Sequence, residues 1–264
     1  MYSGEDEILE DYLVILFFYY IKNIIANIMK TLYESLLDDL DVLSDKADES
    51  LLDSVKKWIN SNYHVVELKI SENTTEDGKL IVNCTRADAN KYVKSLTNGM
   101  FVWGEVTDYF HCAQCRNLTS LEGAPKKVGG TFDCCLCPSL KSLEGAPEEV
   151  GGDFMCHTCN SLKSLEGAPK KVAKSFECSA CDSLKTLKGA PKKIGGDFMC
   201  VDCNSLISLE GAPYEVVGEF TCYRCSSLKT LKGAPKKVGH IFDCEACPSL
   251  ESYDDAPKNC TIYK

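Results

Sequence analysis

Apolar positions recur at a fixed interval through the C-terminal part of the chain. A phenylalanine, a cysteine two residues later, a second cysteine three further on and a leucine three after that all repeat every 22 residues. The phenylalanines are Phe110, Phe132, Phe154, Phe176, Phe198, Phe220 and Phe242. Because one coil of this length cannot bury its own apolar face, repeated copies predict a stacked solenoid.

The spacing within each unit predicts a short strand followed by a turn. Phe154 and Cys156 are two residues apart, so on a strand both side chains point to one face while Met155 points to the other. Gly-Ala-Pro then turns the chain, since Gly permits a positive φ and Pro fixes φ. We therefore expect a ladder of inward-facing side chains. Its members are Phe132, Phe154, Phe176, Phe198, Phe220, Cys156, Cys159, Cys200 and Cys203.

The repeat unit F-x-C-x-x-C-x-S-L-x-x-L-x-G-A-P-x-x-V-G-G-x resembles a leucine-rich repeat (LRR), whose pattern is L-x-x-L-x-L-x-x-N/C-x-L. It departs from that pattern by one residue, because Leu162 lies three rather than two places after Cys159. The half "CNSLKSLEGAP" is also similar to BspA-like LRRs, which would place the main strand on "SLKSLEG". Repeats of this form resemble those of bacterial and phage LRR proteins. The resemblance implies a solenoid architecture and leaves the strand register open.

The seven C-x-x-C pairs have three interpretations. Cys is among the most often buried residue types, so the thiols fit a packed core. Stacked pairs could instead bring four thiols together at the strand spacing of about 4.8 Å, close to what a zinc site needs. The candidate zinc ligands are Cys134, Cys137, Cys156, Cys159, Cys178 and Cys181. Disulfides between coils are the third interpretation, but parallel Cβ vectors suit their geometry poorly.

We favour packed thiols without metal or cofactor, because zinc knuckles place thiols on turns that face outward, whereas these alternate with Phe. The extra Cys135 of "FDCCLC" is expected to point outward and to be the most reactive thiol.

The predicted architecture is α+β: a β-rich, LRR-like solenoid of about seven 22-residue coils, with an N-terminal helical segment and an α/β cap. We place the helical segment at residues 1–44, the cap at 45–100 and the solenoid at 101–264. Val106 matches Val128 in the repeat, so the first coil begins before the first C-x-x-C pair.

Three elements are expected in the cap. "DESLLDSVKKWINSNY" has the periodicity of an amphipathic helix, and "HVVELKI" and "KLIVNC" have the composition of strands joined by the loop "SENTTEDG".

The N-terminal segment is apolar on all sides from Tyr12 to Ile21. That run has ten residues, against about 20 for a membrane span, and Lys22 and Asn23 follow it. We expect it to pack against the protein or to mediate self-association; membrane contact is the less favoured alternative. The residues expected to make the oligomer or partner contact are Leu13, Phe17, Ile21, Ile24 and Ile28.

Composition and charge narrow the possible functions. The net charge of −10 argues against nucleic-acid binding, which requires a basic face. The acidic start "MYSGEDEILED" lacks the positive region of a classical signal peptide, and 17 cysteines then fit a reducing compartment. We expect a cytoplasmic location, in a bacterium or a host cell, or association with a virion. The four histidines occupy no repeated position and no nucleophile or phosphate-binding motif is present, so we expect neither an enzyme nor a small-molecule substrate.

These observations leave two main function classes, with a zinc-binding solenoid as a third alternative. The first is a protein–protein interaction or scaffold module; the second is a structural assembly component of a virion or filament. The Lys and Glu residues after each Gly-Ala-Pro form a charged column, for which we favour a solvated edge over a partner-docking stripe.

Overall fold

The fold was analysed in a computed structural model, which describes residues 49–264. The chain divides into two units, Met1–Ser54 and Val55–Lys264, and the second is described below. The N-terminal contact residues predicted from sequence, from Leu13 to Ile28, lie outside the described residues. Within residues 49–264, no helix combines the length and the apolar content that a membrane span requires.

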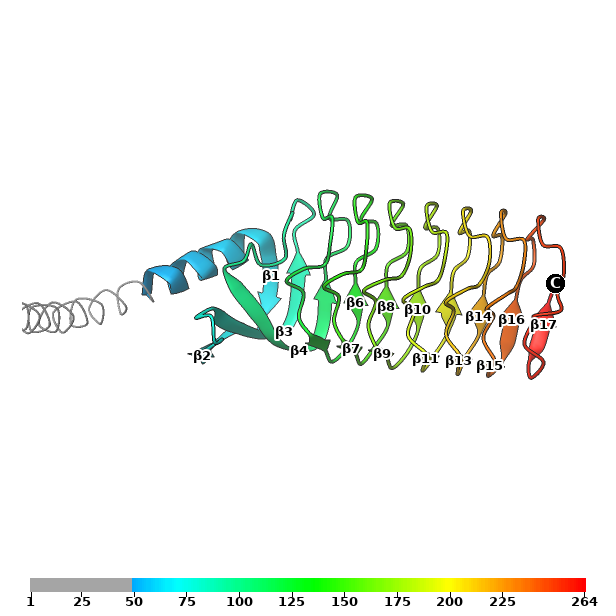
Figure 1. Cartoon of the computed structure of the whole chain (residues 1–264). Helices are drawn as coiled ribbons and strands as arrows, with labels where there is room; N and C mark the ends of the chain where they lie inside the picture. The colour runs from blue at the N-terminus through cyan, green and yellow to red at the C-terminus, as the bar shows by residue number, and fades with distance from the viewer. Residues whose placement is uncertain (1–48) are drawn as a thin grey trace, which may run out of the picture. The chain divides into compact units, whose positions relative to one another are not determined.

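A helix and a small mixed sheet precede the solenoid, as Figure 1 shows. Residues 49–62 are helical, which confirms the amphipathic helix predicted from "DESLLDSVKKWINSNY". The strands are β1 (Tyr63–Val66), β2 (Lys69–Thr74), β3 (Leu80–Ala89) and β4 (Phe101–His111). Strand β3 pairs antiparallel with β1 and β2, and parallel with β4.

The sequence prediction for these strands was wrong in two details. "HVVELKI" forms two strands instead of one, because Glu67 has a φ of 55° and ends β1. Strand β2 then continues to Thr74, into the part that we had expected to be a loop.

Two columns of short parallel strands run along the solenoid (Figure 1). The valine column comprises β5 (Lys127–Val128), β7 (Glu149–Val150), β9 (Lys171–Val172), β11 (Lys193–Ile194), β13 (Glu215–Val216) and β15 (Lys237–Val238). The phenylalanine column comprises β6 (Phe132–Asp133), β8 (Phe154–Met155), β10 (Phe176–Glu177), β12 (Phe198–Met199), β14 (Phe220–Thr221), β16 (Ile241–Asp243) and β17 (Thr261–Tyr263). The sequence left open where the strands lie within each repeat. The structure places them on these two segments.

Strand β4 shows how the two columns are related. It is unbroken, and it pairs with both columns, through Val106 with Val128 and through Phe110 with Phe132. This register confirms the predicted match between Val106 and Val128. In later coils, the segment between the two strands, which is Gly-Gly in three of six coils, bends the chain and divides the strand.

The result is a parallel β-solenoid of roughly eight coils of about 22 residues each, against the seven expected. The leucines lie on a third side of each coil, which has inter-coil hydrogen bonds such as Leu143 N to Glu166 O but no assigned strand.

The core is built from identical side chains stacked on one another. Successive phenylalanine rings from Phe110 to Phe242 lie 5.0 to 5.5 Å apart, and every one is fully buried. The cap covers the first ring, since Trp103 lies 5.5 Å from Phe110 and Tyr63 lies 6.0 Å from it. In the last coil, Ile262 on β17 lies opposite Phe242 on β16 and continues the column.

The Gly-Ala-Pro corner depends on its glycine. Gly145 has a φ of 87°, and a Cβ atom placed there would lie 2.5 Å from the backbone nitrogen of Glu122 in the preceding coil. Any other residue would therefore be strained in conformation and would clash with the neighbouring coil.

Candidate functional site

The paired cysteines form two buried columns inside the solenoid. The first-cysteine column is Cys112, Cys134, Cys156, Cys178, Cys200, Cys222 and Cys244, and the second is Cys115, Cys137, Cys159, Cys181, Cys203, Cys225 and Cys247. The thiol of Cys159 donates to the carbonyl oxygen of Cys134, in the preceding coil, at 3.2 Å. The same bond recurs at 3.1 to 3.3 Å for Cys137, Cys181, Cys203, Cys225 and Cys247. Six of the seven second cysteines are therefore hydrogen-bond donors between coils as well as packed side chains, and Cys115 donates to the Asn90 carbonyl oxygen of the cap at 3.4 Å.

The two residues between the cysteines form a turn. The second of them has a positive φ in every coil, for example 55° at Leu136 and 59° at Thr158. Because the strand ends just before the first cysteine, the alternation of inward and outward side chains does not continue past that cysteine. The prediction that Cys135 is exposed was therefore wrong: it is 2% exposed, and its N–H donates to Asp133 Oδ1 at 2.9 Å.

Burial keeps the thiols of the first-cysteine column protonated. Removal from water raises the pKa of the Cys156 and Cys178 thiols well above the ordinary value, because a buried thiolate lacks solvation. Nucleophilic attack and zinc ligation both use the thiolate, whereas donation to a carbonyl uses the neutral thiol. In the part of the chain that the structure describes, no group of three or more His, Cys, Asp or Glu side chains is placed to hold a metal ion.

A second inter-coil ladder precedes each phenylalanine, and sequence reasoning missed it. Asp153 Oδ1 accepts the Ser175 N–H at 2.9 Å, and Asp197 Oδ1 accepts the Glu219 N–H at 2.8 Å. Ser175 Oγ accepts the Asp197 N–H at 3.1 Å, which links the two pairs. The signal in the sequence is a column of short side chains with an oxygen acceptor, 22 residues apart.

The charged columns form ion pairs between adjacent coils. Lys170 Nζ lies 2.8 Å from a Glu148 carboxylate oxygen, and Lys171 Nζ lies 2.6 Å from a Glu149 oxygen. These side chains are largely exposed, so each pair contributes little to stability. Over these coils the arrangement fits a solvated edge.

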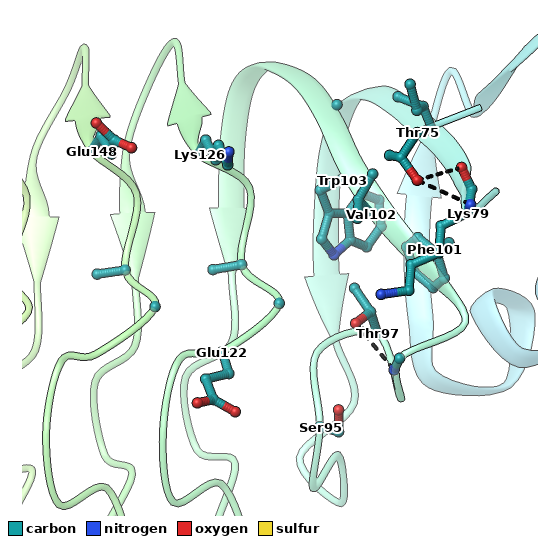
Figure 2. Close-up of a pocket in the computed structure, with 17 residues that line it drawn as sticks. Thr75, Lys79, Ser95, Thr97, Phe101, Val102, Trp103, Glu122, Lys126 and Glu148 are labelled. Atoms are coloured by element: carbon teal, nitrogen blue, oxygen red, sulfur yellow. Dashed lines mark hydrogen bonds between the residues drawn. The ribbon is translucent and has the colours of Figure 1, made fainter. Parts of the chain in front are cut away.

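A cleft of about 830 Å³ lies between the cap and the Gly-Ala-Pro corners of the first two coils. Figure 2 shows the cap residues Lys79 and Thr97 on one side, and Glu122 and Lys126 of the first coil on the other. The apolar lining comes chiefly from Ile81, Phe101, Val102, Trp103, Ala124 and Ala146.

Charged groups of both signs surround this apolar lining. Lys79 lies 2.9 Å from Asp77, and Glu148 is paired with Lys170, whereas Lys126 and Glu122 have no ion pair among the described residues. The Trp103 indole nitrogen is buried and has no hydrogen-bond partner in residues 49–264. Because neighbouring atoms cover it, Trp103 provides apolar ring surface to the cleft.

A row of histidine and aspartate side chains crosses the outer face of the first strands. His64, Asp88, His111 and Asp133 lie in register on β1, β3, β4 and β6. His111 lies 3.5 Å from Asp88 and 3.6 Å from Asp133 through its two ring nitrogens, rather than being freely solvated. Arg86 donates two hydrogen bonds to Asp88, at 2.9 and 3.1 Å, which occupies that carboxylate.

Comparison with models of known protein families, with curated proteins and with solved structures finds no match. The fold assignment therefore comes from the geometry described above, and the resemblance to leucine-rich repeats is a matter of sequence pattern alone.

Proposed function

We propose that this protein is a non-enzymatic protein–protein interaction module of the LRR type, and that the cleft beside the cap docks an extended segment of the partner. The observation that carries the proposal is the cleft of about 830 Å³, apolar inside and bordered by lysines and glutamates. A polypeptide offers apolar and charged groups of both signs within a few residues. The stacked coils provide a rigid wall, which lowers the entropic cost of binding.

A cleft-filling variant tests this proposal. In the full chain, Ala146→Trp would place an indole in the cleft, whereas Ala190→Trp makes the same change at the same corner two coils further on, outside the cleft. We expect proteins that co-purify with the tagged wild-type chain to remain with Ala190→Trp and to be lost with Ala146→Trp. Calorimetry with the purified partner should reproduce the difference. Equal retention by both variants would exclude the cleft, and absence of any protein partner would contradict the interaction function.

The second candidate is a structural assembly component, favoured by one observation. Strand β17 pairs with β16, and no partner for its other edge is present among the described residues. Tyr263 on this strand is 46% exposed, and unpaired strand edges promote association between chains. Size-exclusion chromatography with light scattering separates the two functions: large assemblies of the full chain support the structural role, and a monomer supports the interaction module.

A further inference from the structure

We number the coils from their phenylalanines, so that the first begins at Phe110 and the fifth at Phe198. The fifth coil differs from the others at three exposed positions. Tyr214 is 57% exposed and occupies a position that is Lys or Glu in the coils before and after it. Val217 is 44% exposed and occupies a position that is Gly or Ala elsewhere in the repeat. Ile207 is 54% exposed, on the leucine side of the coil, where other copies have mostly Lys. Tyr214 and Val217 flank strand β13, one on each end, and with the neighbouring lysines they form what we name the coil-5 patch.

The charges around Tyr214 are mainly positive. Lys192 and Lys236 occupy its column in the preceding and following coils, and the Lys236 N–H donates to the Tyr214 carbonyl oxygen at 2.9 Å. Neither lysine has a carboxylate within 4.0 Å in the described part of the chain. In the adjacent column, Glu215 is paired with Lys193 at 2.7 Å, and Lys237 follows it. Four lysines thus accompany one glutamate, in a chain whose net charge is −10.

This differs from the first three coils, where the four lysines of the same columns stand beside two glutamates and, among the described residues, only Lys126 lacks an ion pair. Glu148 and Glu149 pair there with Lys127, Lys170 and Lys171 from the coils on either side. Glu148 lies between two lysines of its column, whereas Tyr214 lies between Lys192 and Lys236. These two lysines therefore have no carboxylate beside them in the column. An exposed tyrosine within such charge has the chemistry of a binding hot spot.

We propose that the coil-5 patch binds an acidic polypeptide segment whose aromatic or aliphatic side chain packs on Tyr214 and Val217. Carboxylates on either side of that anchor would pair with Lys192 and Lys236. These lysines are two coils apart, about 10 Å at the usual strand spacing, which an extended peptide covers in about three residues. Two features favour a protein partner over a nucleic acid: the apolar surface of Tyr214 and Val217, and the net negative charge of this protein as a whole. This inference depends on the proposed interaction function and names the class of partner.

A peptide-display library selected on the full-length protein tests the inference. We expect enrichment of peptides with acidic residues around one apolar residue. Tyr214→Lys/Val217→Gly restores residues that other coils carry, so the fold should be retained, and circular dichroism checks this. The double variant should lose at least tenfold in affinity for the selected peptides, and Lys192→Glu/Lys236→Glu should lose as much. Ile207→Lys, which restores the common residue outside the patch, should bind as the wild type does.

Each other outcome overturns the inference in a recognisable way. Peptides that bind the double variant as tightly as the wild type exclude the coil-5 patch, while the interaction function stands if Ala146→Trp abolishes their binding. A single-stranded oligonucleotide that binds the wild type and loses affinity in both patch variants, with no acidic peptide enriched, would replace the protein partner with a nucleic acid. If neither a peptide nor an oligonucleotide binds, the inference and the proposed function both fail.

Discussion

At the scale of single residues, the thiol of Cys181 donates to the carbonyl oxygen of Cys156 at 3.3 Å, within a fully buried environment. Cys181→Val keeps a similar volume but leaves this carbonyl without its donor. We expect it to lower the free energy of unfolding by about 1–3 kcal/mol, the usual cost of a buried unsatisfied polar group. Denaturant unfolding under reducing conditions measures the change. Cys260→Ser, at a partly exposed position, is the control, and equal stabilities for Cys181→Val and wild type would contradict the role of the donor.

The buried thiols also predict how stability depends on pH. Burial raises the pKa of Cys181 from 9.0 to about 12, so the folded state holds this proton while the unfolded state releases it. The unfolded state therefore gains stability as pH rises from 9 to 12, at up to about 1.4 kcal/mol per thiol per pH unit. Below pH 9 this contribution is constant. Denaturation curves from pH 7 to 11 should show a steep loss above pH 9; a flat profile to pH 11 would contradict thiol burial.

The sequence predicted inward-facing cysteines from their spacing to phenylalanine, but it could not predict the thiol–carbonyl bonds. Those bonds depend on where the turn places the carbonyl of the preceding coil. The error at Cys135 has the same origin, because alternation was extended beyond β6, which ends at Asp133, into the turn that contains Leu136.

At the scale of secondary-structure elements, the acceptor column before each phenylalanine joins successive coils. Asp197→Ala removes the acceptor of the Glu219 N–H, so we expect a loss of about 1 kcal/mol in unfolding free energy. Asp197→Asn retains a side-chain oxygen and should lose less. Denaturant unfolding of both variants checks this order; an alanine variant as stable as the asparagine variant would show that the bond contributes nothing.

The strands themselves were difficult to predict, because most have only two residues. Such strands show no periodicity of their own, and they form because identical segments of neighbouring coils bond to one another. Strand β4, by contrast, is continuous through Thr107 and Asp108, which stand where the next coil has Gly-Gly.

At the scale of the whole molecule, the fixed period of 22 residues was enough to predict a stacked solenoid preceded by a helix. The cleft could not be predicted, because it joins Thr97 of the cap to corner residues such as Ala146 that lie far along the chain. The coil-5 patch was visible in the sequence as departures from the repeat, but only the structure identifies which of them flank one strand.

We propose that the C-x-x-C pairs are reduced, metal-free and internal, which leaves function to the surface. Titration of the full chain with a thiol reagent, without added reductant, tests this most directly. We predict that only Cys260 reacts readily at neutral pH in the native protein, because the other thiols are buried, and that all 17 cysteines react in denaturant without a chelator. Fewer than 17 reactive thiols in denaturant, restored by a chelator or by a reductant, would show bound metal or disulfides and would contradict the account.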